Sequence, residues 1–394
     1  MLQYSQSRPE HVHPLLWKYA TEQAKVAMLR SLPPRIGNAS SSVPYLKREH
    51  LIGARLAIDK QSTNYPLRSL FPREQYEGER LIVRVKTLTP TVGSFTSMDG
   101  AAAMVRPGTY SEIAVEPLYI RDQARLAPSD IALFAMYDEI IQKGGSPGDT
   151  IAAKVARRVT ETADDISLQG RESVHHMYAS ALQGSFAYVI GDVTVTVTYP
   201  LNNLTATFTG AGGAPPAPDW AASAALIIED MAWAMDQFTD AGEGNAVDTI
   251  VYNPKLWAAY MVRNEQWQTF ANQVPGIAAA FMGMGSPLVA PDGSFKDPMW
   301  GLTWIPVRGP HTLPDGSSTQ RWNVKALTFL ALRADMQQVL EHSMVRDQYN
   351  PEADFNIEIY DQLEPKGTFV RYADNGAANI MIPSRVQRLT IDPS

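Results

Sequence analysis

The residues of this chain that could do chemistry are first of all its histidines. His11 and His13 have the spacing of a chelating pair. However, Glu10 is the only acidic residue close to them in the sequence, and the chain has no cysteine to complete a metal site. His175 and His176 are adjacent on a predicted helix, where neighbouring side chains point about 100° apart and cannot face one metal ion. We therefore expect no metal site, and we place His175 and His176 at a surface or an interface.

Paired carboxylates are the second candidates. Asp164–Asp165 and Glu229–Asp230 are each adjacent on a predicted helix, so their carboxylates diverge and neither pair is arranged for acid–base catalysis. Asp236 and Asp240 are four residues apart and could share a cation, but a solvated helix end explains the same spacing. The carboxylates predict no catalytic site.

Sequence motifs and clustered aromatic residues are the third kind of candidate. The sequence contains no Walker P-loop, HExxH, EF-hand or GxSxG motif. The glycine-rich segment Gly210–Pro218 runs into prolines and is interpreted as a linker rather than a phosphate loop. Trp220, Trp233, Trp257 and Trp267 could line a sugar site, but core packing is the default for such residues. We expect no enzyme and no cofactor; a hydrolase or sugar-binding enzyme using these tryptophans is the alternative from another class.

Length and composition describe a globular chain of more than one part. The 394 residues exceed one ordinary core, so two domains or one domain with large appendages are expected. Apolar runs such as Ile277–Met282 fall far short of the roughly 20 residues that span a bilayer. The first ten residues contain no apolar segment, so we expect no secretory signal. The absence of cysteine excludes disulfides and thiolate chemistry.

Charge is distributed unevenly along the chain. Residues 1–90 carry 14 lysines and arginines against 7 acidic residues, whereas residues 91–394 carry 20 against 34. The net charge of −7 argues against a general nucleic-acid binder. A basic arm on an acidic body favours head-to-tail contact between copies. Chance segregation on a solvated surface stays open as the alternative.

A long, thin β-hairpin is predicted near residues 82–120. Leu81–Lys86 alternates apolar and basic residues as a strand does, and Tyr110–Ile120 is the returning strand. An isolated two-stranded ribbon is marginal in water, so this one must lie on its own domain or on a neighbouring subunit. Its loose tip, residues 93–109, carries only Phe95, Met98 and Met104 as larger apolar side chains.

The strongest helical pattern covers residues 149–183. Asp149 or Thr150 can cap its start and Gly184 can end it. A helix of about 35 residues is about 50 Å long, so it must serve as a spine for several elements. Apolar or small residues recur at the helical period at Ile151, Val155, Val159, Ala163, Ile166, Gly170, Val174, Met177 and Ala181.

The elements around this spine are mixed in type. The N-terminal Pro14–Arg30 is predicted to be helical, and residues 186–209 are predicted to form a strand, a turn at Pro200–Asn203 and a strand. A second, α/β part begins after the linker with a helix at Trp220–Phe238, capped by Asp219. Its predicted strands, and those that close the chain, are 248–252, 302–307, 325–332, 355–360, 367–372 and 380–391.

Four segments in this order resemble the lambda-like family of tailed-phage major capsid proteins, which have the HK97-type fold. The segment Pro66–Tyr76 leads into the first hairpin strand. It contains the pairs Pro-Leu, Leu-Phe and Arg-Glu and ends in Tyr, as the family's segment does. The spine helix is followed by Ala181–Gly184 and a strand. Thr249–Tyr260 resembles the family's strand, Asn-Pro-Lys and Trp-Ala helix. Gly301–Leu332 contains a strand, a Leu-Pro-Asp loop and a second strand.

The resemblance implies an α+β fold of the HK97-like type and a set of domain boundaries. Residues 1–65 depart from the family pattern and are either an added clamp on neighbours or a remnant scaffolding segment. The implied parts are an N-terminal arm (1–80), an extended β-hairpin (81–125), a peripheral domain (126–218) with the spine helix 149–183, an axial domain (219–344) and a return to the peripheral domain (345–394).

The resemblance also implies function, partners and location. The chain is expected to self-assemble, as hexamers and pentamers, into the icosahedral head that encloses viral double-stranded DNA, without sequence-specific DNA contacts and without a membrane. A decoration protein, a portal and a scaffolding protein are candidate partners. Assembly is expected in the host cytoplasm, and the final location is the capsid of the virion. An encapsulin-like nanocompartment shell is the alternative on the same fold.

Two groups of residues are expected to contact neighbouring subunits. Some HK97-type shells crosslink a hairpin lysine to an asparagine of a neighbour, but residues 87–120 contain no lysine, so we expect no such covalent bond. The expected contact residues are Phe95, Met98, Met104, Arg106 and Tyr110 in the hairpin, and Arg68, Phe71, Arg73 and Tyr76 in the arm.

Overall fold

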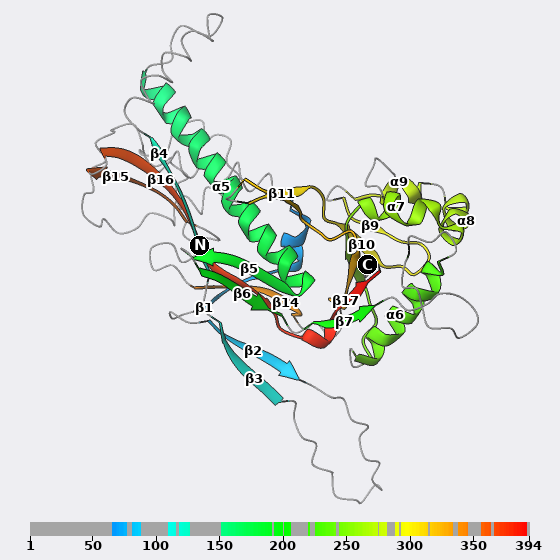
Figure 1. Ribbon diagram of the computed structural model, residues 1–394. Helices are drawn as coiled ribbons and strands as arrows, with labels where there is room; N and C mark the ends of the chain where they lie inside the picture. The colour runs from blue at the N-terminus through cyan, green and yellow to red at the C-terminus, as the bar shows by residue number, and fades with distance from the viewer. Residues whose placement is uncertain are drawn as a thin grey trace, which may run out of the picture. The chain divides into compact units, whose positions relative to one another are not determined.

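The computed structural model describes a large part of the 394 residues (Figure 1). The described part forms two compact units. The described residues are 65–76, 81–87, 109–115, 118–126, 151–190, 193–199, 201–205, 220, 225–241, 244–274, 276–281, 288–290, 293–313, 316–333, 338–345, 356–363 and 366–391.

The two units are each assembled from separate stretches of the chain. The first unit takes its described residues from Leu118–Ser173 and Val345–Gly376. The second takes them from Thr63–Pro117, Val174–Met344 and Ala377–Ser394. The second unit thus includes residues 377–391, which the expected boundaries assigned to the peripheral domain. The division into peripheral and axial domains stays a prediction.

Helix α5 (Ile151–Gln183) is the predicted spine, and Figure 1 shows it as one uninterrupted helix. Gly184 follows it with φ of +101°, a left-handed conformation that glycine adopts without strain, and its N–H bonds to the Ala181 carbonyl. The predicted apolar stripe is buried at every position whose side chain is described: Ala163, Ile166, Gly170, Val174, Met177 and Ala181.

The strands of the first unit form an antiparallel arrangement around β16 (Lys366–Ile380). Strand β15 (Asn356–Leu363) pairs with it along its whole length, and β4 (Leu118–Leu126) pairs with residues 368–376. Strand β16 is therefore a central strand here, which requires its backbone to be bonded on both sides.

The second unit is organised around a mixed six-stranded sheet in the order β7-β17-β13-β8-β10-β9. Pairs β8–β10 and β7–β17 are parallel, whereas β13 runs antiparallel to both β8 and β17. Central strand β13 is buried at every position, as expected of a strand covered on both faces. The strands are β7 (Asn202–Thr205), β8 (Thr249–Tyr252), β9 (Phe295–Lys296), β10 (Thr303–Pro306), β13 (Ala326–Leu330) and β17 (Val386–Thr390).

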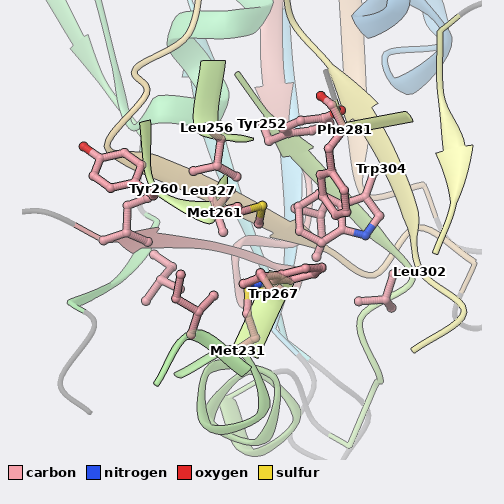
Figure 2. Packing of buried hydrophobic residues seen from close by; sticks show 14 of the residues in the cluster. Met231, Tyr252, Leu256, Tyr260, Met261, Trp267, Phe281, Leu302, Trp304 and Leu327 are labelled. Atoms are coloured by element: carbon pink, nitrogen blue, oxygen red, sulfur yellow. The ribbon is translucent and has the colours of Figure 1, made fainter. Parts of the chain in front are cut away.

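Helices cover this sheet and enclose an aromatic core. The largest buried side chains include Trp267, Phe281 and Trp304 (Figure 2). Phe281 packs edge to face on both tryptophans, and Trp304 packs edge to face on Tyr252 of β8. Edge-to-face packing is the favoured geometry of aromatic pairs. The helices are α6 (Ile227–Ala241), α7 (Lys255–Ala259), the 3-10 turn η3 (Met261–Arg263), α8 (Glu265–Gln273) and α9 (Ile277–Phe281).

Two buried asparagines fix where the helices begin. Asn253 accepts a bond from the Lys255 N–H at 3.0 Å and donates to the Trp322 carbonyl at 2.7 Å, so the Asn-Pro sequence does open α7. Asn264 caps α8 by accepting from the Trp267 N–H at 3.1 Å. The same side chain donates to the Ala225 carbonyl at 2.6 Å, which ties the helix to the chain before α6.

Three two-stranded ribbons are also present among the described strands. Strands β5 (Ser185–Ile190) and β6 (Val193–Thr198) pair with each other, and so do β11 (Pro310–Thr312) and β12 (Ser318–Gln320). The predicted strand–turn–strand over 186–209 was therefore wrong in detail. The chain already reverses after Ile190, and the residues beyond Pro200 join the six-stranded sheet as β7.

The third ribbon is the predicted hairpin. Strand β2 (Leu81–Thr87) pairs antiparallel with β3 (Thr109–Val115), from Leu81 opposite Val115 to Thr87 opposite Thr109. The helix predicted at Pro14–Arg30 lies outside the described residues. In the described part of the chain, no helix is both long and apolar enough to cross a membrane.

Candidate functional site on the spine helix

Residues 65–76, called the arm segment here, lead into the hairpin and contain four predicted contact residues. The 3-10 turn η2 (Pro66–Leu70) opens with proline, whose fixed φ suits a first helical position, and it buries Leu67 and Leu70. Strand β1 (Arg73–Tyr76) follows and pairs with β14 (Leu340–Val345). The arm segment is thus folded onto its own unit at both ends.

Phe71 anchors the middle of the arm segment. Its side chain is 1% exposed, and its ring lies parallel to that of Tyr178 on α5, with 4.3 Å between the ring centroids. Stacked aromatic pairs contribute roughly 0.5–1.5 kcal/mol beyond the burial of their area. The Phe71 ring is therefore packed inside its own chain, and its contact with a neighbouring subunit stays a prediction.

Tyr76 is held by a buried carboxylate. Its Oη donates to Oε1 of Glu341 at 2.7 Å, and the Ser343 hydroxyl donates to the same oxygen. Asn379 of β16 donates to Ser343 Oγ at 2.8 Å, and Gln338 donates to Glu341 Oε2 at 3.4 Å. This polar network connects β1, β14 and β16, and buried networks of this kind specify one arrangement of their strands.

The network changes the ionisation of Tyr76. Burial, then the hydrogen bond to Glu341 and its negative charge, raise the pKa of the Tyr76 phenol to about 12. The phenol therefore keeps its proton, and its role as donor to Glu341, well above neutral pH.

The other predicted contact residues of the arm are partly exposed. Arg68 lies in the last turn of η2. Arg73 lies on β1, where its Nη1 is 3.9 Å from the Met344 sulfur. Both side chains are therefore partly open to solvent.

The predicted hairpin residues are only partly covered by the structure. Tyr110 lies on β3, opposite Lys86 of β2. Phe95, Met98, Met104 and Arg106 lie outside the described residues. Contact between these residues and a neighbouring subunit stays a prediction.

The two histidines of the spine helix were expected at a surface or an interface, and the structure does not confirm a surface position. His175 is 2% exposed, and the partly buried His176 faces His311 of β11, with 4.4 Å between the ring centroids. His311 was not singled out from the sequence, since no local pattern joins residues so far apart. In the part of the chain that the structure describes, no group of three or more His, Cys, Asp or Glu is placed to hold a metal ion.

The carboxylates and tryptophans considered as candidate site residues are placed as structural or solvent-exposed residues. Asp230 is buried and accepts a 2.8 Å bond from the Trp220 indole, while its neighbour Glu229 is exposed, so this pair diverges as expected. Asp236 and Asp240 are exposed on α6. Trp220, Trp257 and Trp267 are buried in the core, so they cannot line an open sugar site.

Comparison with known proteins identifies the chain. The model of the family described as Phage major capsid protein E matches residues 57–373. The chain belongs to this phage major capsid protein E family. It is a structural, non-enzymatic protein whose copies form the shell of an icosahedral phage head, and it is a component of the virion.

The structural comparison confirms the HK97-like fold that the sequence predicted. A crystal structure of a putative prophage capsid protein from E. coli CFT073 is 12% identical, with coverage of 88% of this chain and 99% of the other and a TM-score of 0.54. The Cyanophage P-SCSP1u capsid is 13% identical (82% and 87% coverage, TM-score 0.42).

A further capsid structure and the search of curated proteins complete the comparison. The capsid of the Myoviridae phage XM1 is 9% identical (82% and 90% coverage, TM-score 0.45). Comparison with curated protein sequences found no match. The family match decides between the two hypotheses for the shell, a phage head and an encapsulin-like nanocompartment, because it assigns the chain to the phage capsids.

Proposed function

We propose that, within the head, the hairpin β2–β3 and the N-terminal arm hold neighbouring capsid subunits together by non-covalent packing. The subunits form hexamers and pentamers around double-stranded DNA, which they contact without sequence preference. The acidic balance of residues 91–394 supports the last point, since it offers few net positive charges to phosphates. A portal, a scaffolding protein and a decoration protein are the further partners we propose.

The observation that carries this proposal is the pairing of the hairpin. Among the described strands, β2 and β3 pair only with each other. A two-stranded ribbon is marginal by itself in water, and its outer edges present unpaired backbone groups. A neighbouring subunit would supply the missing surface.

The sequence of the hairpin is two-sided in the register observed. Positions 81, 83 and 85 share one face of the ribbon with positions 111, 113 and 115, and five of these six carry Leu, Val or Ile. The opposite face includes Arg84 across from Glu112. We propose the apolar face as the one that packs on the neighbour.

The arm segment has a supporting role in this proposal. Phe71 and Tyr76 hold it on its own subunit, through Tyr178 and Glu341, so the hairpin starts from a fixed base. Arg68 and Arg73 are partly exposed, and we propose that they approach a neighbour. A hairpin on a fixed base loses less conformational freedom when it docks.

Deletion of residues 93–108, with a short Gly-Ser link in their place, tests the role of the hairpin. We expect the variant to stay folded, with the circular dichroism of the wild-type subunit, but to form no closed shells in negative-stain electron microscopy. A variant with the same residues in scrambled order controls for length. Closed shells of normal size from the deletion variant would refute the proposal.

Single substitutions test which face is used. Val83→Glu places a charge on the apolar face and should reduce the yield of closed shells at least tenfold, since burying an unpaired charge is costly. Arg84→Gln, at the adjacent position on the other face, is the matched control and should assemble normally. Equal yields from the two variants would exclude the apolar face as the contact.

A further inference from the structure

Helix α7 and the turn η3 expose one continuous stripe of side chains. The exposed positions recur three or four residues apart, whereas Leu256, Trp257 and Met261 between them are buried in the aromatic core. Val262 is 41% exposed, and no other large hydrophobic side chain in the described part of the chain is exposed to this degree. We call this stripe the basic face; it consists of Lys255, Ala258, Ala259, Val262 and Arg263.

The basic face has the composition of a protein contact. Its middle positions, Ala258, Ala259 and Val262, are uncharged, and the stripe begins and ends with a cation. An apolar centre inside a polar rim is the usual anatomy of a protein–protein interface. Surfaces that bind nucleic-acid phosphates gather many positive charges instead. The basic face therefore favours a protein partner with exposed carboxylates.

The same unit exposes carboxylates on helix α6. Asp236 and Asp240 are exposed and lie four residues apart, on the side away from the buried Met231, Ala234 and Phe238. We call the exposed stripe of α6 the acidic face; it consists of Glu229, Ala232, Asp236 and Asp240.

The acidic face is charged against the preference of its own helix. Carboxylates are favourable near a helix N-terminus and unfavourable near its C-terminus. Asp240 lies in the last turn of α6, and that turn contains no basic residue. Glu229, in the first turn, is well placed and accepts a 2.7 Å bond from Gln266. A local rule broken in this way is expected where a residue serves a contact outside its own helix.

One copy of the chain carries both halves of a complementary pair. Figure 1 shows α6 and α7 apart from each other, at the lower and upper sides of the helices that cover the sheet. Helix α8 contacts both α6 and η3. Each face carries charge of one sign, so two copies facing each other across a two-fold axis would bring like charges together. A head-to-tail arrangement brings opposite charges together and can close into a ring.

We propose that the basic face of one capsid subunit packs on the acidic face of the next and that this contact closes the hexamers and pentamers. The inference rests on the proposed assembly into such rings and names a contact within them. One exposed ion pair contributes little by itself. A ring repeats the contact at every subunit, so reversing the charges of one face places like charges at each repeat.

Charge reversal on either face tests the contact. Lys255→Glu/Arg263→Glu makes the basic face acidic, and like charges should lower the yield of closed shells at least about tenfold in negative-stain electron microscopy. Asp236→Lys/Asp240→Lys makes the acidic face basic and should have the same effect. Because lysine suits the C-terminal end of a helix, this variant should keep the circular dichroism of the wild type.

The combined variant and a control separate this contact from a general effect of charge. All four reversals together restore the complementarity with the signs exchanged, so the yield of shells should return to within about threefold of the wild type. Lys296→Glu/Arg308→Glu reverses two exposed charges elsewhere in the second unit and is the matched control, which should assemble normally.

A mixture of the two reversed variants tests the ring itself. One variant carries acidic residues on both faces and the other carries basic residues on both, so complementary contacts form only where the two alternate. Alternation is possible around a hexamer but not around a pentamer. The mixture should therefore give hexamers in open or tubular assemblies, without the pentamers that close an icosahedral shell.

Several results would overturn the proposal. They are normal yields of shells from either two-residue variant, no recovery in the combined variant, and a mixture that assembles no better than its components or closes normally. Loss of shells in the Lys296/Arg308 control would show that net charge, and not these two faces, causes the loss. The hairpin is intact in every variant, so a failed contact role of the hairpin would leave the recovery by the combined variant unchanged.

Discussion

Gly170 of α5 lies directly against the ring of Tyr372 on β16. A methyl group added at Gly170 would lie 2.1 Å from Cε1 of Tyr372 and 2.3 Å from its Cδ1, far inside contact distance. The Tyr372 side chain is 0% exposed and its hydroxyl donates to Asp374 at 3.3 Å, so the ring has little room to move. The absence of a side chain at position 170 therefore sets the distance between the helix and the strand.

Gly170→Ala should destabilise the protein, although alanine normally favours a helix. Within a helix the exchange of Gly for Ala gains about 1 kcal/mol. Overpacking a filled site costs about 1–3 kcal/mol, so we expect a net loss and a lower urea midpoint measured by far-UV circular dichroism. A midpoint higher than that of the wild type would show that Tyr372 does not confine this position.

A second variant separates this clash from other effects at Gly170. Tyr372→Ala alone should lower the midpoint, since it empties a buried site. The double variant Gly170→Ala/Tyr372→Ala should have a urea midpoint only slightly below that of Tyr372→Ala, because the effects of two residues in contact are not independent. Fully additive losses would contradict direct contact.

Phe71→Ala should release the arm segment from α5. Removing a buried phenylalanine costs about 3–5 kcal/mol, and here the loss includes the stacking on Tyr178. We expect a lower urea midpoint and faster proteolysis between residues 65 and 76. Gln75→Ala, at an exposed position of the same segment, is the control and should change stability by less than about 0.5 kcal/mol.

Tyr76→Phe should weaken the subunit at neutral pH but not at high pH. The change removes the bond to Glu341, and a hydrogen bond to a charged group contributes about 1.5–3 kcal/mol. The pKa of Tyr76 is raised to about 12 in the folded state, so the wild type loses this contribution as pH rises from about 10 through 12. The difference between the two proteins in urea midpoint should shrink from pH 9 to pH 11.5; a constant difference would exclude the titration of Tyr76 as its source.

Asn264→Ala should destabilise the helical layer of the second unit. The variant loses the cap of α8 and leaves the Ala225 carbonyl without its 2.6 Å donor, which together cost about 2–4 kcal/mol. Asn272→Ala, at an exposed position of the same helix, should lie within about 0.5 kcal/mol of the wild type. The urea midpoints of the two variants should therefore differ clearly.

Mature particles should dissociate completely in denaturing gels. Residues 87–120 contain no lysine, so this part of the hairpin cannot form an amide with an asparagine of a neighbour. We expect a single band at the subunit mass after boiling in detergent. A ladder of linked subunits would show that another residue forms a covalent bond.

Local patterns were sufficient for several elements of this fold. The period of the apolar residues predicted α5 and its buried stripe, and Gly184 ends the helix as expected. The short apolar runs predicted β8, β10 and β13, which are central strands of the second unit. In these cases the signal lies within one turn or one strand, where neighbouring residues decide the conformation.

Contacts between distant residues could not be predicted in the same way. Nothing near Tyr76 indicates that it bonds to Glu341, and nothing near His176 indicates His311. The turn after Ile190 did have a signal, since Gly191-Asp192 between two β-branched runs is a typical hairpin turn. The parallel pairing of β7 with β17 had none, because it joins residues 185 positions apart.

The burial of tryptophan in the second unit has an optical consequence. Every tryptophan except Trp17 lies between Trp220 and Trp322, and Trp220, Trp257, Trp267, Trp304 and Trp322 are buried. The stretches Leu118–Ser173 and Val345–Gly376 of the first unit contain none. The tryptophan emission should therefore be blue-shifted and resistant to iodide quenching while the second unit is folded. It should change little when those two stretches of the first unit unfold. Spectra recorded during particle disassembly would thus distinguish the two units without an added label.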